Sequence, residues 1–579
     1  MNLFHKKKLG IFTLLLLFLV LFLIGYLSST NLSFDRFTRK TFQSRVSSNT
    51  LTLHYTIENP AAYDISIQEA TLGHFTPDET TASLTEAENL QKKLHRFFPA
   101  NLSIDRELTY DLLSDSLKTE LAFAPFYYYQ EPLSPISGYP NQLPILLSEY
   151  RIQTEQDIQS YFALLSQIPG LFSEILTFEK EKSKQGMFLC DSLASEAASD
   201  CLTFAGQTDS NVLMSSFRQR LDQLSTLSAK KKQSYLTEHQ RLLSQNVLPA
   251  YRMLGEGIQA LTGSGTEGGL CCLPKGKQYY LLLLKKSTGS SKSPDQMLKQ
   301  IEQHRQACLS STRSLLQSSP STAIKEPVMS LTSPAAMIED LKEKITDRFP
   351  AASNCNLTLK TVDASQQDTA SPAFYMVPPI DHLTENTIYL NPAKTSQPVY
   401  IYTTLAHEGY PGHLYQTTLS SQYYSSPLRS LLSYPGFTEG WATYVEYDSY
   451  RYLPFEADVA ALLQQNNDVI LSLYASLDLL IHWKGYRLSE AADFLAGYGI
   501  TDAATITSIY QAIVAEPVNY LKYYIGYLEI LELRDYAKEL MRDDFSIKKF
   551  HHALIQIGEA PFYIIKKYLP YYLKHTGEI

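Results

Sequence analysis

Two histidines and two glutamates are the residues of this sequence best suited to metal chemistry. His407 and Glu408 are adjacent, His413 follows six positions after His407, and Glu439 lies further along the chain. Two imidazoles and one carboxylate form a ligand set of catalytic zinc, which leaves a coordination position for water. A glutamate beside a ligand histidine is well placed to take a proton from that water. The pattern predicts one Zn²⁺ ion held by His407, His413 and Glu439, with Glu408 as the general base.

The six-residue spacing requires a break in the helix. On an ideal helix the rings of His407 and His413 would diverge by about 240°. Pro411 cannot donate a hydrogen bond to the carbonyl of His407, and Gly412 tolerates unusual backbone angles. We therefore expect the helix to bulge or break here, so that His413 can turn back toward the ion. Imidazole and carboxylate also suit iron, manganese or cobalt, so zinc follows only from ligand type.

A further carboxylate follows at the helical spacing of the predicted ligand. Glu446 lies seven residues after Glu439 and would share its helix face. It could accept the second ring N–H of a ligand histidine, or it could be an exposed helix carboxylate.

The motif resembles a known family. His407-Glu408-Gly409-Tyr410-Pro411-Gly412-His413, with Glu439-Gly440-Trp441, is similar to the bacterial domain-of-unknown-function 885 family, a zincin-like group with an HExxPGH motif. Other segments also resemble the family, so that the similarity covers nearly everything after the first 27 residues: 273–280, 371–381, 478–485, 523–534 and 550–561. The resemblance implies a mainly α-helical, gluzincin-like fold with a small β-sheet and a deep cleft. It also implies peptidase or carboxypeptidase activity.

The resemblance suggests further catalytic candidates. Tyr523 could donate to the oxyanion that forms at the scissile carbonyl, and His551 could assist charge stabilisation. His482 and Asp478, four residues apart, could line the cleft, with Asp478 supporting the site from behind. Taken alone, Tyr523 would be a core tyrosine, and the Asp478–His482 pair would be an ordinary helix contact.

Two residues are candidates for substrate binding. Arg534 could hold a substrate carboxylate with two parallel hydrogen bonds. Tyr410 lies inside the motif itself. The sequence departs from the family at Tyr524, where many relatives carry Lys, which bears on substrate preference more than on the metal.

Most of the chain has helical periodicity. Apolar residues recur at three- and four-residue spacing in eight segments: 90–98, 158–179, 217–248, 294–316, 400–408, 439–452, 459–483 and 520–541. Segments 373–378 and 387–391 are β-prone and predict a small sheet, and 278–284 could be a short strand. We expect a mostly helical region over 28–370 and a zinc-binding region over 371–579, and we expect the two to form one continuous unit of the family.

The amino terminus predicts a membrane anchor. Lys6, Lys7 and Lys8 precede an uncharged apolar run from Leu9 to Leu27, which as a helix would span about 28 Å. The charge pattern predicts a cytoplasmic stub over 1–8, a single-pass span over 9–27 and an extracytoplasmic remainder in the cell membrane. A cleaved signal peptide is the alternative. No cysteine lies in or just after the run, which argues against a lipoprotein linkage.

Composition excludes one class of partner. The net charge is −9 and the sequence pI is about 5.9, so the chain lacks the basic footprint that nucleic acids require. The six cysteines could pair outside the cytoplasm, and Cys190 with Cys201 is the simplest local loop. The sequence does not fix the oligomeric state.

These observations favour a membrane-anchored, extracytoplasmic zinc hydrolase that cleaves a peptide substrate. The alternative is a catalytically silent surface protein that binds peptides or wall fragments on the same scaffold. An intact Glu408 beside intact ligands favours the enzyme, because a binding module does not need a general base.

Overall fold

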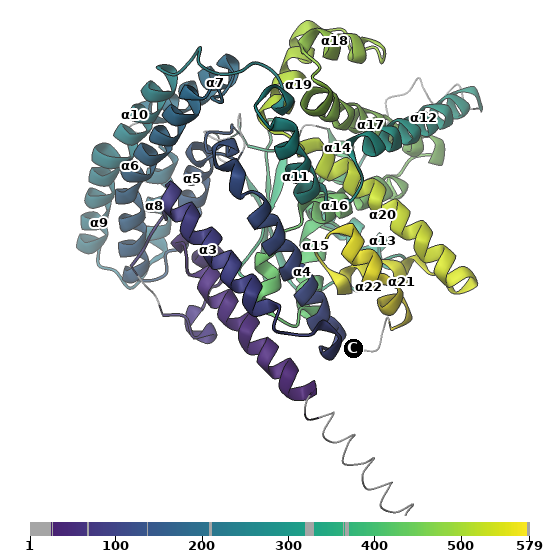
Figure 1. The fold of residues 1–579 in the computed structure, drawn as a ribbon, viewed down its shortest axis with the longest axis horizontal. Coiled ribbons are helices and arrows are strands. Elements are labelled where there is room, and N and C mark those ends of the chain that lie inside the picture. The colour runs from purple at the N-terminus through teal and green to yellow at the C-terminus, as the bar shows by residue number, and fades with distance from the viewer. Residues whose placement is uncertain are drawn as a thin grey trace, which may run out of the picture.

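The computed structural model describes residue 25 and residues 27–575, except 67–68, 136, 208–210, 319–328, 363, 365–366, 368–369 and 396. Helices make up most of this part of the chain, and one small sheet lies among them (Figure 1). A helix over 27–46 is followed by α2 (Thr50–Thr56), α3 (Pro77–Leu94), α4 (Ile104–Ala122), α5 (Tyr139–Ser148), α6 (Glu155–Lys184), α7 (Asp191–Gly206), α8 (Val212–Gln223), α9 (Ala229–Leu242) and α10 (Leu248–Gln259).

The remaining helices surround the sheet and complete the chain. They are α11 (Gly276–Thr288), α12 (Pro294–Ser318), α13 (Pro334–Lys344), α14 (Pro398–Glu408), α15 (His413–Ser420), α16 (Pro435–Ser449), α17 (Ala457–Leu479), α18 (Leu488–Ala496), α19 (Ala503–Ala515), α20 (Asn519–Met541), α21 (Ile547–Ile557) and α22 (Phe562–Lys574). The mainly α-helical prediction is confirmed.

The sheet has three strands, β1 (Asn356–Thr361), β2 (Ala373–Met376) and β3 (Glu385–Leu390), in the order β1-β3-β2. β1 runs parallel to β3, whereas β2 is antiparallel to β3, with Ala373 opposite Leu390. The sequence predicted β2 and β3. It did not predict β1, which is short and has no fully buried residue.

Two predictions about local structure are wrong. Residues 278–284 belong to α11, because Tyr280, Leu284 and Thr288 are buried at four-residue spacing, which is a helical period. The helix predicted over 217–248 is interrupted between α8 and α9, where the side chain of Ser228 caps the start of α9.

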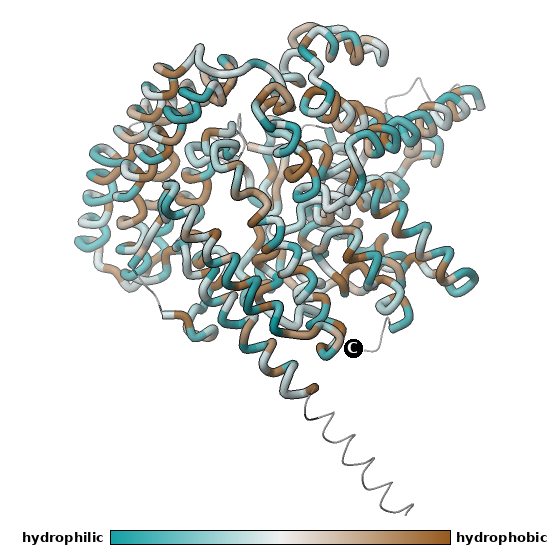
Figure 2. Tube along the Cα trace, in the orientation of Figure 1, coloured by the Kyte–Doolittle hydropathy of each residue, from teal (hydrophilic) through white to brown (hydrophobic). Residues whose placement is uncertain are grey.

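Two large apolar cores hold the helices together. The second core is formed mainly by α5 to α10, seen on the left of Figure 1. The main core runs from Phe34 to Leu573, so residues before and after position 370 share it. Figure 2 shows hydrophobic positions on the inner sides of these helices and hydrophilic positions on the outer sides.

Among the described residues, α6 is the one helix long and apolar enough to cross a bilayer. Over half of its most apolar stretch, 56%, is buried inside the protein, which is typical of a core helix. The predicted span over 9–27 lies outside the described residues, apart from 25 and 27.

All six cysteines are free thiols in this structure. The expected pairing of Cys190 with Cys201 is excluded by α7, because Cys190 caps this helix and Cys201 lies inside it. Eleven helical residues separate their Cα atoms by about 16 Å, whereas a disulfide needs less than about 7 Å.

Candidate metal centre

The helix that carries the first histidine ends where the sequence predicts a break. α14 ends at Glu408, and α15 begins at His413. Gly412 is required here, since a Cβ atom at this position would lie 1.7 Å from the carbonyl oxygen of His407. The indole Nε1 of Trp441 donates to the carbonyl of Pro411 over 2.9 Å, which ties the break to α16.

The break brings the two imidazoles to one carboxylate. The Nε2 atoms of His407 and His413 lie 3.7 Å and 3.3 Å from Oε2 of Glu439. The three side chains are 13–20% exposed, so solvent can reach them. Three ligand atoms converging on one accessible point fit a tetrahedral zinc site with a position left for water.

Glu408 lies beside this cluster, close to both imidazoles. A carboxylate oxygen of Glu408 and one ring nitrogen from each of His407 and His413 all lie within 4.8 Å of one another. Its Oε2 accepts a hydrogen bond of 2.8 Å from the main-chain N–H of Tyr375 in β2. The Glu408 carboxylate is therefore held by the sheet and faces the metal ligands.

Glu446 supports His407 from behind. Its Oε2 lies 2.9 Å from Nδ1 of His407, so that Nδ1–H can donate to the carboxylate while Nε2 faces the metal position. This contact fixes the ring orientation and raises the basicity of the ligand nitrogen.

The charges of the cluster shift its pKa values in opposite directions. Burial alone would raise the pKa of Glu439, but hydrogen bonds from His407 and His413 hold it well below its ordinary value. Burial would lower the pKa of His407, but its two carboxylate partners raise it well above its ordinary value. Burial raises the pKa of Glu408, and the neighbouring histidines oppose this rise.

A close helix crossing places α20 against the cluster. A Cβ atom added to Gly440 in α16 would lie 2.4 Å from the backbone of Gly526 in α20, so the helix backbones are in near contact. This crossing places the ring of Tyr523 6.2 Å from that of His407. Burial, followed by the charges of Glu439 and Glu408, raises the pKa of Tyr523 well above its ordinary value, so it is a hydroxyl donor.

The sequence reasoning missed two charged groups next to the site. Nζ of Lys522 lies 3.7 Å from Oε1 of Glu439. Glu559 accepts a hydrogen bond from the main-chain N–H of Tyr434 over 3.4 Å, and burial raises its pKa to about 7. His413 and Glu439 also act on the pKa of Glu559, which places it near the cluster. Lys522 could have been found from the sequence because it is adjacent to the candidate Tyr523. For Glu559 the only available signal was that it lies in the segment 550–561, which resembles the family.

Three other candidates are not brought to the cluster. His551 is buried, with Nε2 3.0 Å from the hydroxyl of Tyr444 and Nδ1 2.8 Å from the carbonyl of Arg348. His482 uses Nδ1 to accept from the N–H of Leu270 and Nε2 to bind the carbonyl of Ile513. Because both ring nitrogens of each histidine are hydrogen-bonded to groups outside the cluster, neither histidine remains a catalytic candidate.

Asp478, the third of these candidates, is also occupied by contacts that hold the fold together. It accepts hydrogen bonds from the hydroxyl of Tyr280 over 2.6 Å and from the N–H of Val518 over 2.7 Å. Asp478 therefore joins α11 and the start of α20 to α17. Its carboxylate and the ring of His482 bind different partners and form no hydrogen bond with each other.

Arg534 and Tyr410 are not brought to the cluster as substrate-binding residues either: Arg534 is partly exposed but distant along its helix, and Tyr410 is buried. Arg534 lies eleven residues after Tyr523 on α20, about 16 Å along the helix axis, with its Nε 3.9 Å from Asp535. Tyr410 is 2% exposed, and its hydroxyl lies 3.4 Å from Sγ of Cys355. Tyr410 therefore packs the motif loop.

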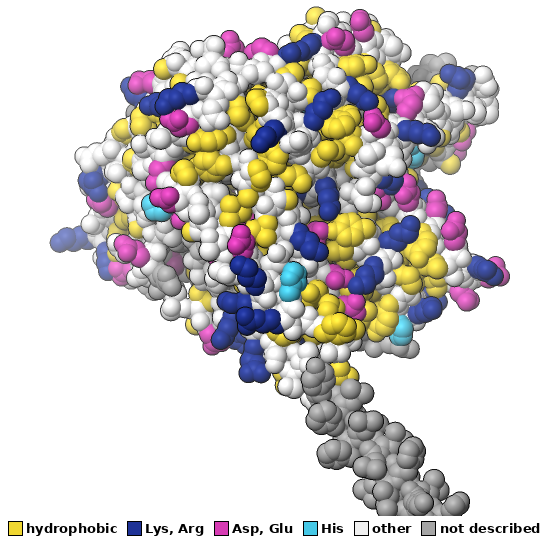
Figure 3. Space-filling model, viewed as in Figure 1, with side chains coloured by type: hydrophobic (Ala, Val, Ile, Leu, Met, Phe, Trp, Pro, Cys, Tyr) yellow, Lys and Arg dark blue, Asp and Glu magenta, His cyan; other side chains and the backbone are white. Residues whose placement is uncertain are grey.

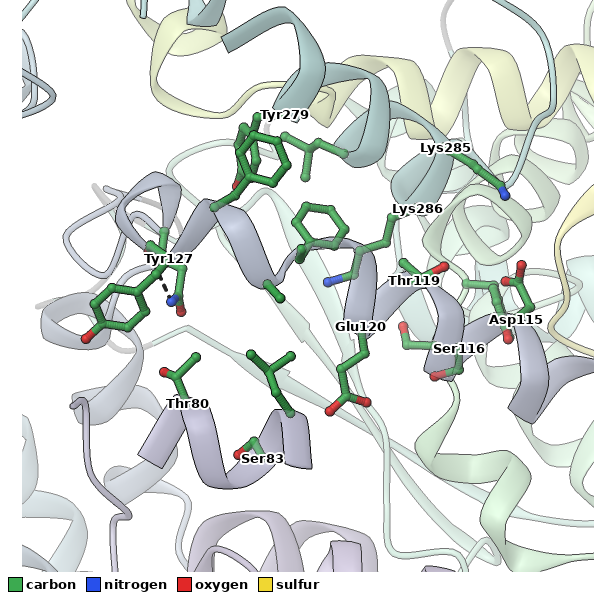
Figure 4. A pocket seen from close by; sticks show the side chains of 18 of the residues that line it. Thr80, Ser83, Asp115, Ser116, Thr119, Glu120, Tyr127, Tyr279, Lys285 and Lys286 are labelled. Carbon is green, nitrogen blue, oxygen red and sulfur yellow. Dashed lines mark hydrogen bonds between the residues drawn. The ribbon is translucent and has the colours of Figure 1, made fainter. Parts of the chain in front are cut away.

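A pocket of about 580 Å³ lies between α3, α4 and α11. Figure 4 shows Thr80 and Ser83 on one wall, Asp115, Ser116, Thr119 and Glu120 on another, and Tyr279, Lys285 and Lys286 opposite. None of the cluster residues lines it. Its wall also includes Tyr434, whose main-chain N–H donates to Glu559.

Comparisons with known proteins agree on the fold and name no activity. The family profile described as "Bacterial protein of unknown function (DUF885)" matches residues 61–569. The crystal structure of a candidate lipoprotein from Colwellia psychrerythraea is similar with a TM-score of 0.83 at 19% identity, over 94% of this chain and 100% of that chain. A candidate lipoprotein of unknown function from Shewanella oneidensis has a TM-score of 0.68 at 16% identity, over 92% and 99% of the two chains. No curated protein matches the sequence.

Proposed function

The chain belongs to the bacterial DUF885 family, and from the geometry of its His/Glu cluster we propose that it is a zinc-dependent hydrolase, of gluzincin-like architecture, that cleaves peptide bonds. One observation carries the proposal: His407, His413 and Glu439 converge on one accessible point while Glu408 stands beside them. A binding site for metal alone would not need the fourth group.

The donor set fits zinc and supplies hydrolytic chemistry. Zinc at this position would lower the pKa of a coordinated water toward 7 and polarise a carbonyl oxygen. Glu446 keeps His407 in the tautomer that presents Nε2. The resulting arrangement has the carboxylate–histidine contact that is typical of catalytic zinc proteins.

Glu408 has the position that a general base needs. Its carboxylate is held by the N–H of Tyr375 and faces the metal ligands, so it can accept a proton during attack and return it to the leaving amine. The ring of Tyr523 lies 6.2 Å from that of His407, and its protonated hydroxyl can donate to the developing oxyanion.

The surroundings suit an extended peptide. β2 pairs with β3 on one side only among the described strands, and the N–H of Tyr375 points from the other side toward Glu408. An unpaired strand edge can bind a peptide through main-chain hydrogen bonds. The pocket behind Tyr434 and Glu559 offers room for substrate residues beyond the cleaved bond.

The Glu408→Gln variant tests the catalytic assignment. Amide replaces carboxylate at nearly equal volume, so hydrolysis of a peptide library should fall by at least 100-fold while zinc per chain stays unchanged. Glu343→Gln, at an exposed position of α13, is the matched control and should keep full activity. Wild-type activity in the Glu408 variant would refute the assignment, and peptide binding without cleavage by the wild type would favour a silent binding protein.

We also propose that the protein is held at the outer face of the cell membrane by residues 9–27. The two structural neighbours are candidate lipoproteins, which are attached through a lipidated cysteine, but the first cysteine here is Cys190. Basic side chains gather on the lower part of one face, over α3 and the helix at 27–46 (Figure 3), where anionic headgroups would attract them. Deletion of residues 1–27 should release the protein from the membrane fraction, and its retention there would refute the assignment.

A further inference from the structure

A second group of metal-ligating side chains lies between α12 and α17, outside the site described above. His304 and Cys308 are four residues apart on α12 and so share one helix face. Asp468 faces them from α17, which packs along α12. One ligand atom from each of the three residues lies within 4.8 Å of the others.

We propose that His304, Cys308 and Asp468 form a second metal site, which takes a borderline-soft divalent ion such as Zn²⁺ and clasps α12 to α17.

The distances between the three ligand atoms allow one ion to be bound after small side-chain movements. Nε2 of His304 lies 3.1 Å from Oδ2 of Asp468. Two ligand atoms bound to one tetrahedral zinc ion lie about 3.4 Å apart, because each metal–ligand bond is about 2.1 Å long. Both atoms already have nearly this separation, and the thiol of Cys308 lies within 4.8 Å of each.

The carboxylate is oriented by other groups, as ligand carboxylates usually are. The hydroxyl of Tyr524 donates to Oδ1 of Asp468 over 2.6 Å, so that Oδ2 is the oxygen that faces His304. Oδ2 also accepts two longer contacts, from the hydroxyl of Tyr527 at 3.5 Å and from Nε2 of Gln464 at 3.4 Å. The aromatic rings of Tyr524 and Tyr527 also stand edge-on to the ring of His304, 6.2 Å and 5.7 Å away, and confine it. Such outer partners hold a ligand in place and tune its affinity.

Burial and charge also suit an ion. Asp468 is 1% exposed, whereas His304 and Cys308 are half-buried, so an ion could enter from the side of α12. A carboxylate and a thiolate would balance the two charges of the ion. Burial raises the pKa of the Cys308 thiol to about 12, so the thiol proton would pass to solvent as the metal–sulfur bond forms. The buried Arg305, which follows His304 in the sequence, is turned toward Ser476 and Glu302.

Cobalt distinguishes this site from the catalytic cluster. The cluster of His407, His413 and Glu439 contains no sulfur, whereas Co²⁺ bound to a thiolate gives a near-ultraviolet charge-transfer band. The metal-stripped full-length protein should develop this band on titration with Co²⁺. The band should persist in a His407→Ala/His413→Ala variant, so its appearance does not depend on the proposed hydrolytic site.

Single substitutions then assign the ligands. Cys308→Ser should lose the band and about one equivalent of zinc per chain, whereas Cys272→Ser, at a thiol of similar exposure, should keep both. His304→Ala retains the thiol and should weaken cobalt binding at least tenfold, with an unchanged circular dichroism spectrum that excludes unfolding. Absence of the band in the wild type, or its survival in Cys308→Ser, would overturn the proposal.

Discussion

Replacing Glu446 by Gln should weaken zinc binding without removing the chemistry. The wild-type carboxylate accepts from Nδ1 of His407 over 2.9 Å, and both side chains are partly exposed, at 21% and 13%. Losing a carboxylate of this kind typically costs 10- to 100-fold in metal affinity, or about 1.4 to 2.8 kcal/mol. Because solvent screens this pair in part, we expect the lower end, about tenfold.

The assay separates affinity from turnover. Competition with a chromogenic chelator gives the zinc affinity, and peptide hydrolysis is then measured with zinc in saturating excess. The variant should bind zinc about tenfold more weakly but keep hydrolysis within a few-fold of the wild type when it is fully loaded. An affinity within twofold of the wild type would refute the argument that Glu446 orients His407, and Glu343→Gln, at an exposed position of α13, should show no change.

Two further predictions concern the motif loop and a buried histidine. Gly412→Ala places a Cβ atom 1.7 Å from the carbonyl oxygen of His407, so it should abolish zinc retention; normal zinc content by elemental analysis would contradict this. Burial lowers the pKa of His551 to about 3 from 6.5, so the folded state binds fewer protons than the unfolded state between these values, and stability falls as the pH drops below about 6.5. From pH 6.5 to 5 this histidine should cost about 2 kcal/mol of unfolding free energy, and denaturant titrations of His551→Gln should show a smaller loss; an equal loss in both proteins would contradict it.

Most of the candidate site could be predicted from sequence because its signal is local. His407, Glu408 and His413 lie on one short segment, and Pro411 with Gly412 supplies the reason for the break between the helices. β2 and β3 were also predictable, since β-prone residues separated by a turn favour an antiparallel pair. The parallel pairing of β1 depends on contacts across the chain, which periodicity does not record.

The other candidates show where sequence reasoning ends. A buried neutral histidine such as His551 and a ligand histidine such as His407 are the same residue in a sequence, and only their partners distinguish them. Lys522 and Glu559 reach the site through the packing of α20 and of the segment after α21, which the sequence does not specify locally.

The near contact of Gly440 with Gly526 restricts how the protein can move. Glu439 precedes one of these glycines and Tyr523 lies a turn before the other, so the two helices hold the proposed metal ligand and the proposed oxyanion donor in one frame. In the proposed hydrolase, these two groups would keep their relative placement while substrate enters and product leaves.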